Sequence, residues 1–203
     1  MRFTPQLRAF DWLVARPIAH RGLHTKSKGI IENTAGAFEA AINGNYAIEC
    51  DVQLTADGEA IVFHDDDLDR LTEAKGPVKA LTTQALQKVK LKATSDRMLT
   101  LAELLEQVDG RATLVIELKS LWDGDDALAK RALQVLENYD GPYCLMSFDP
   151  EVIACLRTLS PQTVRGIVAD RATDPSYNAL PLAKRYAMRT FAHLAETQPH
   201  FVS

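Results

Sequence analysis

The sequence contains few cysteines and no long hydrophobic run. Its three cysteines are odd in number, and none is spaced C-x-x-C. We therefore expect reduced thiols in a cytoplasmic protein, without a disulfide framework or a cysteine-ligated zinc site. No stretch approaches the ~18 apolar residues of a membrane span, so we expect no integral membrane segment. Charges at Arg8, Asp11 and Arg16 interrupt residues 1–17, which argues against a signal peptide.

Positive charge is also in short supply. The chain has 23 Lys and Arg against 27 Asp and Glu, a net charge of −4, whereas nucleic-acid binding depends on basic patches. We therefore expect no nucleic-acid partner. The hydrophobic content of 46% and charged content of 25% are ordinary for a globular protein. A chain of 203 residues can form one domain with a sizeable core, and we treat residues 1–203 as that domain.

Short apolar runs alternate with helical patterns along the chain. Runs typical of strands occupy residues 16–20, 46–54, 59–64, 112–118, 142–148, 163–169 and 200–203. Helical patterns occupy residues 33–45, 82–91, 100–108, 125–141, 149–161 and 180–197. Such alternation predicts parallel strands covered by helices. The fold class is therefore α/β, and seven strands are one fewer than a (β/α)₈ TIM-type barrel contains.

Several polar side chains share a position at or near the carboxyl end of a predicted strand: His20, Glu49, Asp51, His64, Glu117 and Lys119. Side chains alternate along a strand, so Glu49 and Asp51 share one face. The connection from Asp51 to His64 is too short for a crossover helix, so His64 returns near Asp51, either as a hairpin or as an extended segment. Barrel enzymes gather their catalytic groups at this end, so we expect these side chains to converge at one mouth.

The chemistry of this group points to a metal and a phosphate. Carboxylates that converge repel one another, and a hard cation such as Mg²⁺ or Ca²⁺ removes that cost because it takes oxygen ligands. Two histidines beside the ion would act as general base and general acid. Arg21, next to His20, offers a planar fork that suits a phosphate. Together these residue types favour phosphoester chemistry.

Each feature taken alone has an ordinary structural interpretation. Glu117 with Lys119 would be an exposed ion pair of little energetic value. Residues 32–34 would be a helix cap, and the acidic residues between positions 65 and 69 a solvated loop. Two other functions stay open: a glycosidase with paired carboxylates, and a barrel that binds ligands without turnover. The glycosidase would leave both histidines and Arg21 without a role.

Five segments of the chain resemble the glycerophosphodiester phosphodiesterase family. They read IAHRG (18–22), ENT (32–34), IECDVQLTADGEAIVFHDDDLDRLTEAKGPV (48–78), IELK (116–119) and SFDPEVIACLR (147–157). The resemblance covers roughly residues 16–170, and the segment 48–78 is its most specific part. It implies a TIM barrel that hydrolyses a small-molecule glycerophosphodiester, in a metal-dependent reaction, to glycerol 3-phosphate and an alcohol.

The resemblance also implies roles for individual residues. Glu49, Asp51 and Glu117 would hold one divalent cation, Mg²⁺ or Ca²⁺. His20 and His64 would be the acid–base pair, and Arg21 and Lys119 would contact the phosphodiester. A small helical insertion at about residues 66–108 would overhang the mouth and shape substrate choice.

Several points stay open on the sequence alone. A lysophospholipase D that acts on lysolipids would differ only in the leaving group and tail. The residues do not identify the alcohol, the metal, the order of the histidine roles, or whether a neighbouring hydroxyl or water attacks phosphorus.

The C-terminal end of the chain departs from the family pattern. Family members continue through a last strand with a W-T-V pattern that this chain lacks. We therefore expect residues 200–203 to lie seventh in the sheet, beside residues 163–169. An open seam would then border residues 16–20, with Ile18 partly uncovered. We expect such a seam to lower stability and to favour association through the exposed edge.

Overall fold

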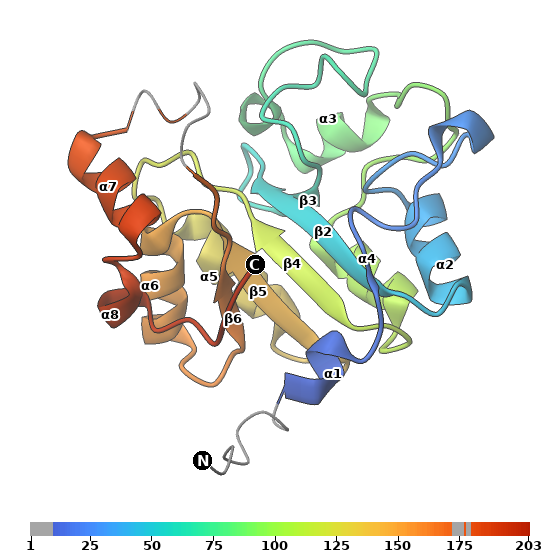
Figure 1. Ribbon diagram of the computed structural model, residues 1–203. Coiled ribbons are helices and arrows are strands. Elements are labelled where there is room, and N and C mark those ends of the chain that lie inside the picture. The colour runs from blue at the N-terminus through green and yellow to red at the C-terminus, as the bar shows by residue number, and fades with distance from the viewer. Residues whose placement is uncertain (1–9, 172–176, 178–179) are drawn as a thin grey trace.

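The computed structural model describes residues 10–171, 177 and 180–203. Residues 1–9, part of the segment judged unlike a signal peptide, lie outside this range. Parallel strands form one curved sheet in the order β1-β2-β4-β5-β6-β7 (Figure 1). Their bounds are β1 Ile18–Ala19, β2 Ala47–Leu54, β4 Leu114–Leu118, β5 Tyr143–Ser147, β6 Arg165–Ile167 and β7 Phe201–Val202. The predicted α/β barrel-type architecture is confirmed.

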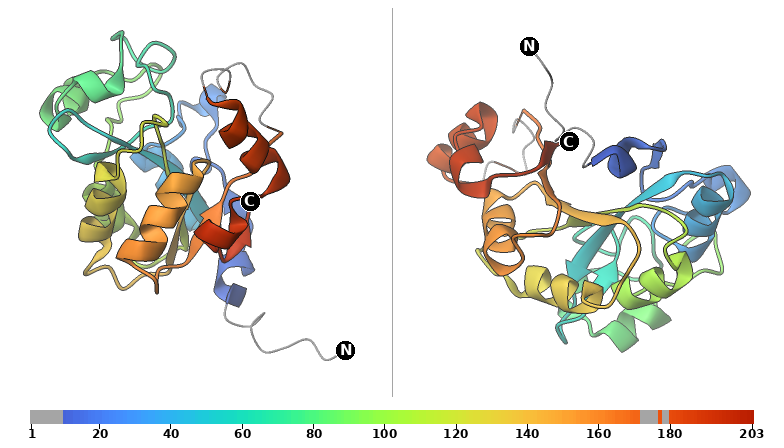
Figure 2. Two further views of the ribbon diagram at one scale, coloured as in Figure 1. Left: turned by 90° about the vertical axis from the view of Figure 1, so that its left-hand side faces the viewer. Right: turned by 90° about the horizontal axis from the view of Figure 1, so that it is seen from below.

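Helices cover the convex face of this sheet (Figure 2). They are α2 Ala35–Asn43, α4 Leu101–Val108, α5 Ala127–Leu136 and α6 Pro150–Leu159. On α4, Leu101, Leu104, Leu105 and Val108 follow helical spacing and are all buried in the main core. At the start of α6, the Asp149 side chain accepts a hydrogen bond from Glu151 N, and Pro150 is the first helical residue.

One predicted barrel strand belongs to a hairpin instead. The strand β3, Ala60–Val62, pairs antiparallel with the end of β2. The connecting segment is short and turns at Gly58, whose φ is +79°. All seven predicted strands occur in the sheet, but six of the described strands run parallel, so β7 lies sixth along the sheet and not seventh as expected.

The seam expected in the sheet lies between β1 and β7. As predicted, β7 pairs with β6, and among the described residues no pairing joins β7 to β1. Ile18 on β1 is 44% exposed. The effects on stability and association remain predictions.

Residues between β3 and α4 form a small lobe with its own core. That lobe contains the short helices η3 Val78–Ala80 and α3 Thr83–Lys88, and its core includes Phe63, Leu68, Leu86 and Met98. The helix α4 packs in the main core instead. The domain limits and the insertion limits at about 66–108 remain predictions.

The C-terminal helical pattern is split in two. The single helix predicted over residues 180–197 is α7 Leu182–Thr190 followed by α8 Leu194–Thr197, because Phe191 ends α7 in the left-handed conformation with φ of 57°. Two short elements, α1 Asp11–Val14 and η2 Lys26–Lys28, had no prediction. None of the helices in the described part of the chain is both long and apolar enough to cross a membrane.

Candidate functional site

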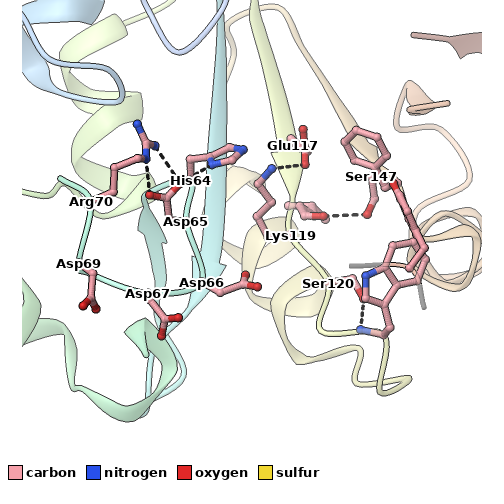
Figure 3. Close-up of a pocket in the computed structure, with 14 residues that line it drawn as sticks. His64, Asp65, Asp66, Asp67, Asp69, Arg70, Glu117, Lys119, Ser120 and Ser147 are labelled. Atoms are coloured by element: carbon pink, nitrogen blue, oxygen red, sulfur yellow. Dashed lines mark hydrogen bonds and ion pairs between the residues drawn. The ribbon is translucent and has the colours of Figure 1, made fainter. Parts of the chain in front are cut away.

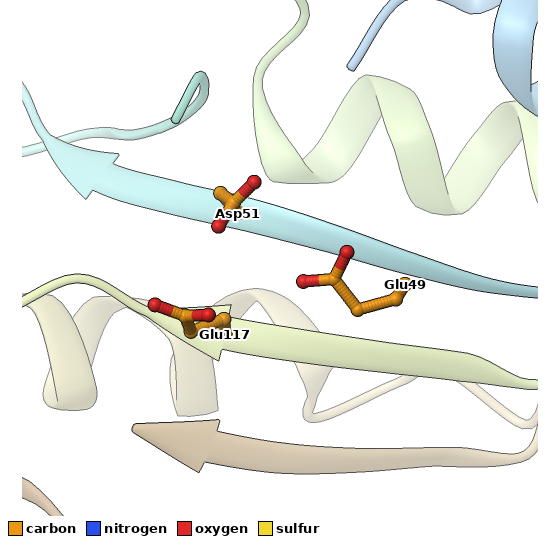
Figure 4. Close-up of side chains that lie close together, drawn as sticks. All are labelled: Glu49, Asp51 and Glu117. Atoms are coloured by element: carbon orange, nitrogen blue, oxygen red, sulfur yellow. The ribbon is translucent and has the colours of Figure 1, made fainter. Parts of the chain in front are cut away.

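The register of three neighbouring strands brings the predicted carboxylates together (Figure 4). Asp51 on β2 is paired with Glu117 on β4. Glu49 was expected at or near the carboxyl end of its strand, but it is the third residue of β2. It reaches the site because the neighbouring strand β1 ends at Ala19, which pairs with Ile48. Glu49 is therefore level with the first residue beyond β1, which is His20.

The three carboxylates form a compact buried cluster. One oxygen each from Glu49, Asp51 and Glu117 lies within 4.8 Å of the others. Burial, and then the charge of Asp51, raises the pKa of Glu49 to about 8, and burial also raises the pKa of Glu117. Glu49 Oε1 is buried without a hydrogen-bond partner. Unpartnered anionic oxygens on converging carboxylates are what a hard divalent cation binds, so the donor set fits such an ion.

Two basic side chains partly neutralise the cluster. Lys119 Nζ lies 2.6 Å from Glu117 Oε1 and 2.9 Å from Asp51 Oδ1. Burial alone would lower the pKa of Lys119, but the charges of Asp51 and Glu117 outweigh it and raise the pKa. Arg21 Nε lies 3.4 Å from Asp51 Oδ2, and the Arg21 backbone N–H donates to Glu49 Oε2 at 2.9 Å. Both cations that were predicted to contact phosphate therefore lie beside the carboxylates.

The two histidines flank the cluster from different elements. His20 follows β1, with Nε2 3.9 Å from Glu49 Oε2. The His20 side chain is 69% exposed, but partial desolvation at the site, and then the charge of Arg21, lower the His20 pKa. This favours the neutral form that a general base needs. His64 follows β3, and the preceding Phe63 N–H donates to Asp51 O at 3.0 Å, so the hairpin returns His64 near Asp51 as predicted.

The predicted site residues share one opening. A cavity of about 370 Å³ is lined by His20, Arg21, Glu49, His64, Glu117 and Lys119, among others. Asp51 is almost fully buried beneath it, in contact with Lys119 and Arg21. The structure thus brings all seven predicted residues together, while their chemical roles remain proposals.

Sequence reasoning missed three residues that contact this group and a fourth, Arg70, that joins two of them. Asn33 Nδ2 donates to Asp51 Oδ2 at 2.8 Å. Glu32 accepts from Arg21, and Asp65 lies 2.7 Å from His64 Nδ1. Arg70 donates to both Glu32 and Asp65, and Figure 3 shows it beside Asp65 and His64. The interpretation of Asp65 as part of a solvated loop was therefore wrong. The only sequence signal for these four residues was their presence in the segments 32–34 and 48–78, which carry the family resemblance.

A turn of two left-handed residues aims Arg21 at the cluster. Arg21 has φ of 58° and Gly22 has φ of 78°. The Gly22 N–H donates to Ala19 O at 3.1 Å and to Glu49 O at 3.2 Å, which fixes the turn against β2. A Cβ on Gly22 would lie 2.8 Å from the Cβ of Ala37 and 2.9 Å from its backbone. Only glycine therefore fits this position without movement.

We expect Gly22→Ala to destabilise the protein by about 1–3 kcal/mol, because it combines backbone strain with a contact against α2. The measurement is urea unfolding. Gly58→Ala is the matched control, since Gly58 has nearly the same φ, +79°, but no atom within 4 Å of the added Cβ. Equal losses in the two variants would show that the contact with Ala37 contributes nothing.

The sequence is similar to a family of known proteins and to several of its members. Residues 20–203 match the model of the "Glycerophosphoryl diester phosphodiesterase family". A glycerophosphodiester phosphodiesterase of Caldanaerobacter subterraneus subsp. tengcongensis is 33% identical over 74% of this chain and 65% of its own length. A putative glycerophosphodiester phosphodiesterase of Bacillus subtilis is 31% identical over 87% of this chain and 73% of its own length. The chain thus spans about two thirds of these relatives.

Solved structures agree on the fold. A phosphodiesterase of Oleispira antarctica, solved in complex with the product sn-glycerol-3-phosphate, superposes with a TM-score of 0.75 at 24% identity, over 94% of this chain and 75% of that one. A glycerophosphodiester phosphodiesterase of Agrobacterium tumefaciens superposes with a TM-score of 0.62 at 25% identity, over 92% of this chain and 85% of that one.

Proposed function

The chain belongs to the glycerophosphoryl diester phosphodiesterase family, and on that premise we propose that it hydrolyses glycerophosphodiesters to glycerol 3-phosphate and an alcohol. The observation that carries the proposal is the buried triad of Glu49, Asp51 and Glu117, flanked by two histidines and two basic side chains in one cavity. The relatives' names and the product bound to the Oleispira enzyme support a small phosphodiester as the substrate.

Glu49, Asp51 and Glu117 would hold one divalent cation, Mg²⁺ or Ca²⁺. When bound, the cation would supply positive charge to the phosphate oxygens as the reaction proceeds. The unpartnered Glu49 Oε1 and the raised pKa of Glu49 support this assignment, because both report a carboxylate without enough positive charge around it.

The remaining residues would bind the phosphate and move protons. Arg21 and Lys119 would orient the phosphodiester, Arg21 through a planar fork and Lys119 as a point charge. One imidazole, of His20 or His64, would take the proton of the attacking hydroxyl. The other would give its proton to the departing alcohol oxygen, so that neither a hydroxide nor an alkoxide is released. The attacking hydroxyl belongs either to water, which gives glycerol 3-phosphate directly, or to the neighbouring carbon of the glycerol group. In the second case phosphorus forms a cyclic phosphate, which water then opens to glycerol 3-phosphate with the two imidazoles in reversed roles.

The other functions find less support. Membership of the family does not favour a metal-free glycosidase. A lysolipid substrate would be favoured by an apolar rim on the insertion, but the exposed large hydrophobic side chains of the described residues all lie outside residues 66–108. A barrel that binds without turnover makes a different prediction from the enzyme in the assay below.

The test is turnover of a panel of glycerophosphodiesters with different alcohols, alongside a lysolipid, with EDTA and then with Mg²⁺ or Ca²⁺ restored. We expect release of glycerol 3-phosphate that EDTA stops and a divalent cation restores. Binding of glycerophosphodiesters without any product would refute the enzymatic proposal. Turnover of the lysolipid alone would replace the proposed substrate class.

A change at Lys119 separates cation binding from catalysis. We expect Lys119→Met to bind Mg²⁺ or Ca²⁺ more tightly than the natural chain. In the natural chain, Lys119 Nζ forms ion pairs with two of the proposed ligands, Asp51 and Glu117, and would compete with the cation for them. Turnover should fall, because a phosphate contact is lost. Titration calorimetry with the metal alone and steady-state kinetics measure the two effects. Weaker cation binding in the variant would contradict the competition.

A further inference from the structure

Arg70 joins two parts of the site that are far apart in the sequence. Its guanidinium donates to both oxygens of Asp65, from Nε at 2.6 Å and from Nη2 at 2.8 Å. It also donates to both oxygens of Glu32, from Nη1 at 3.0 Å and from Nη2 at 2.7 Å. Two bidentate contacts on one guanidinium fix its plane and fix both carboxylates.

Each of these carboxylates holds a residue of the proposed chemistry. Asp65 Oδ1 lies 2.7 Å from His64 Nδ1. With Asp65 ionised, the hydrogen bond requires the proton on Nδ1, which leaves His64 Nε2 for the reaction. Glu32 Oε1 accepts from Arg21 Nη1 at 2.7 Å. A continuous chain of hydrogen bonds therefore runs from His64 through Asp65, Arg70 and Glu32 to Arg21.

We propose that Arg70 is a positioning residue that aligns the acid–base group His64 with the phosphate-binding group Arg21 by bridging Asp65 and Glu32. Arg70 lies in the segment between β3 and α4, so the insertion would support catalysis as well as shape the mouth of the site. The inference rests on the proposed function for its catalytic consequence. The alignment itself is a property of the folded chain.

The charges of the bridge are consistent with this role. Arg70 lies between the two carboxylates and donates to both, so its positive charge offsets much of the negative charge that Glu32 and Asp65 bring to the site. Hydrogen bonds from Arg70, helped by Arg21, outweigh burial and lower the pKa of Glu32 to about 2. Burial would raise the pKa of Asp65, but hydrogen bonds from Arg70 and His64 lower it. Both carboxylates thus stay ionised and remain acceptors at neutral pH.

The kinetic test compares Arg70→Ala with Arg97→Ala. Arg97 is a matched control because it also lies between β3 and α4, is 47% exposed against 48% for Arg70, and holds Glu103 through two hydrogen bonds away from the site. We expect Arg70→Ala to lower kcat by about 10–100-fold and to raise KM, in line with other residues that orient site groups. Arg97→Ala should match the natural chain.

Two further variants separate positioning from charge. Arg70→Lys keeps the charge but cannot make two bidentate contacts, so it should lose nearly as much kcat as Arg70→Ala. Combining Arg70→Ala with Asp65→Asn should lower kcat by less than the product of the two single losses, because Arg70 acts on His64 through Asp65. Full activity in Arg70→Lys, or losses that simply add in the double variant, would overturn the proposal.

A nitrogen NMR measurement of His64 gives a readout that does not depend on turnover. In the natural chain the His64 ring should carry its proton on Nδ1, and in Arg70→Ala the two tautomers should mix; comparison with His64→Gln assigns the signal. An unchanged His64 tautomer in Arg70→Ala would overturn the alignment. Absence of turnover in the natural chain, with the tautomer change still present, would refute the proposed function alone.

Discussion

Replacing His20 or His64 by alanine should lower kcat by about 10²–10⁴-fold, the usual contribution of a general acid or base. The affinity for Mg²⁺ or Ca²⁺ should remain close to that of the natural chain. The proposed ligands are three carboxylates within 4.8 Å of one another. His64 hydrogen-bonds to Asp65 instead of to a proposed ligand, and His20 Nε2 is 3.9 Å from Glu49. In the proposed mechanism, proton transfer and cation binding therefore depend on different side chains.

The measurement combines steady-state kinetics with calorimetric titration of the metal alone. His24→Ala is the control, because His24 lies beyond the Arg21–Gly22 turn and is exposed like His20, but it does not line the cavity. Retained turnover in both single variants would remove the histidines from the mechanism. Loss of cation affinity in His20→Ala would instead assign His20 to the metal site.

The carboxylate cluster could be predicted from the sequence because it depends on a regular property of strands. Alternation along β2 places Glu49 and Asp51 on one face, and parallel pairing brings Glu117 of β4 level with Asp51. The position of Glu49 in the site was harder to predict, because it depends on where the neighbouring strand β1 ends. Single-sequence patterns locate strand ends poorly, and the predicted run 16–20 shortens to Ile18–Ala19 in the structure.

The hydrogen-bonded residues around the cluster could not be predicted in the same way. Glu32 and Arg70 are 38 residues apart and lie in loops, where no periodicity indicates which side chains meet. The helix cap in residues 32–34, by contrast, could be identified because capping is local, and Thr34 caps α2 in the structure. The hairpin of β3 stayed an open alternative, since a short connection is compatible with more than one return path. Contacts that depend on loop closure thus require the structure.

Divalent cations should stabilise the protein more strongly as pH rises. Burial, and then Asp51, raises the pKa of Glu49 from 4.5 to about 8 in the metal-free fold. Because the folded-state pKa lies above the unfolded value, the protonated carboxyl stabilises the fold at low pH. That contribution is lost as pH rises from 4.5 to about 8. At ~1.4 kcal/mol per pKa unit, the loss is on the order of 5 kcal/mol.

A bound cation requires the ionised Glu49 carboxylate. It therefore offsets the loss of stability at alkaline pH, where that loss is greatest. At a concentration about 100 times Kd, the cation adds ~2.7 kcal/mol to the free energy of unfolding, and Kd should itself fall with rising pH. We therefore expect the increase in Tm on adding Mg²⁺ or Ca²⁺ to be small near about pH 5.5 and large near about pH 8.5. Differential scanning calorimetry with the metal alone measures it.

Glu49→Gln should reverse both effects at once. Glutamine keeps the shape and an acceptor for the Arg21 N–H but cannot ionise. The metal-free variant should therefore be more stable than the natural chain at alkaline pH, while its Tm should respond little to added cation. Glu106→Gln is the control, because Glu106 is exposed on α4 and absent from the cavity lining. A Glu49→Gln variant that is less stable at alkaline pH without metal would show that its ionised carboxylate already has sufficient partners in Arg21 and Lys119. In that case the triad would not need a cation to complete its charge balance, and the metal assignment would lose its electrostatic support.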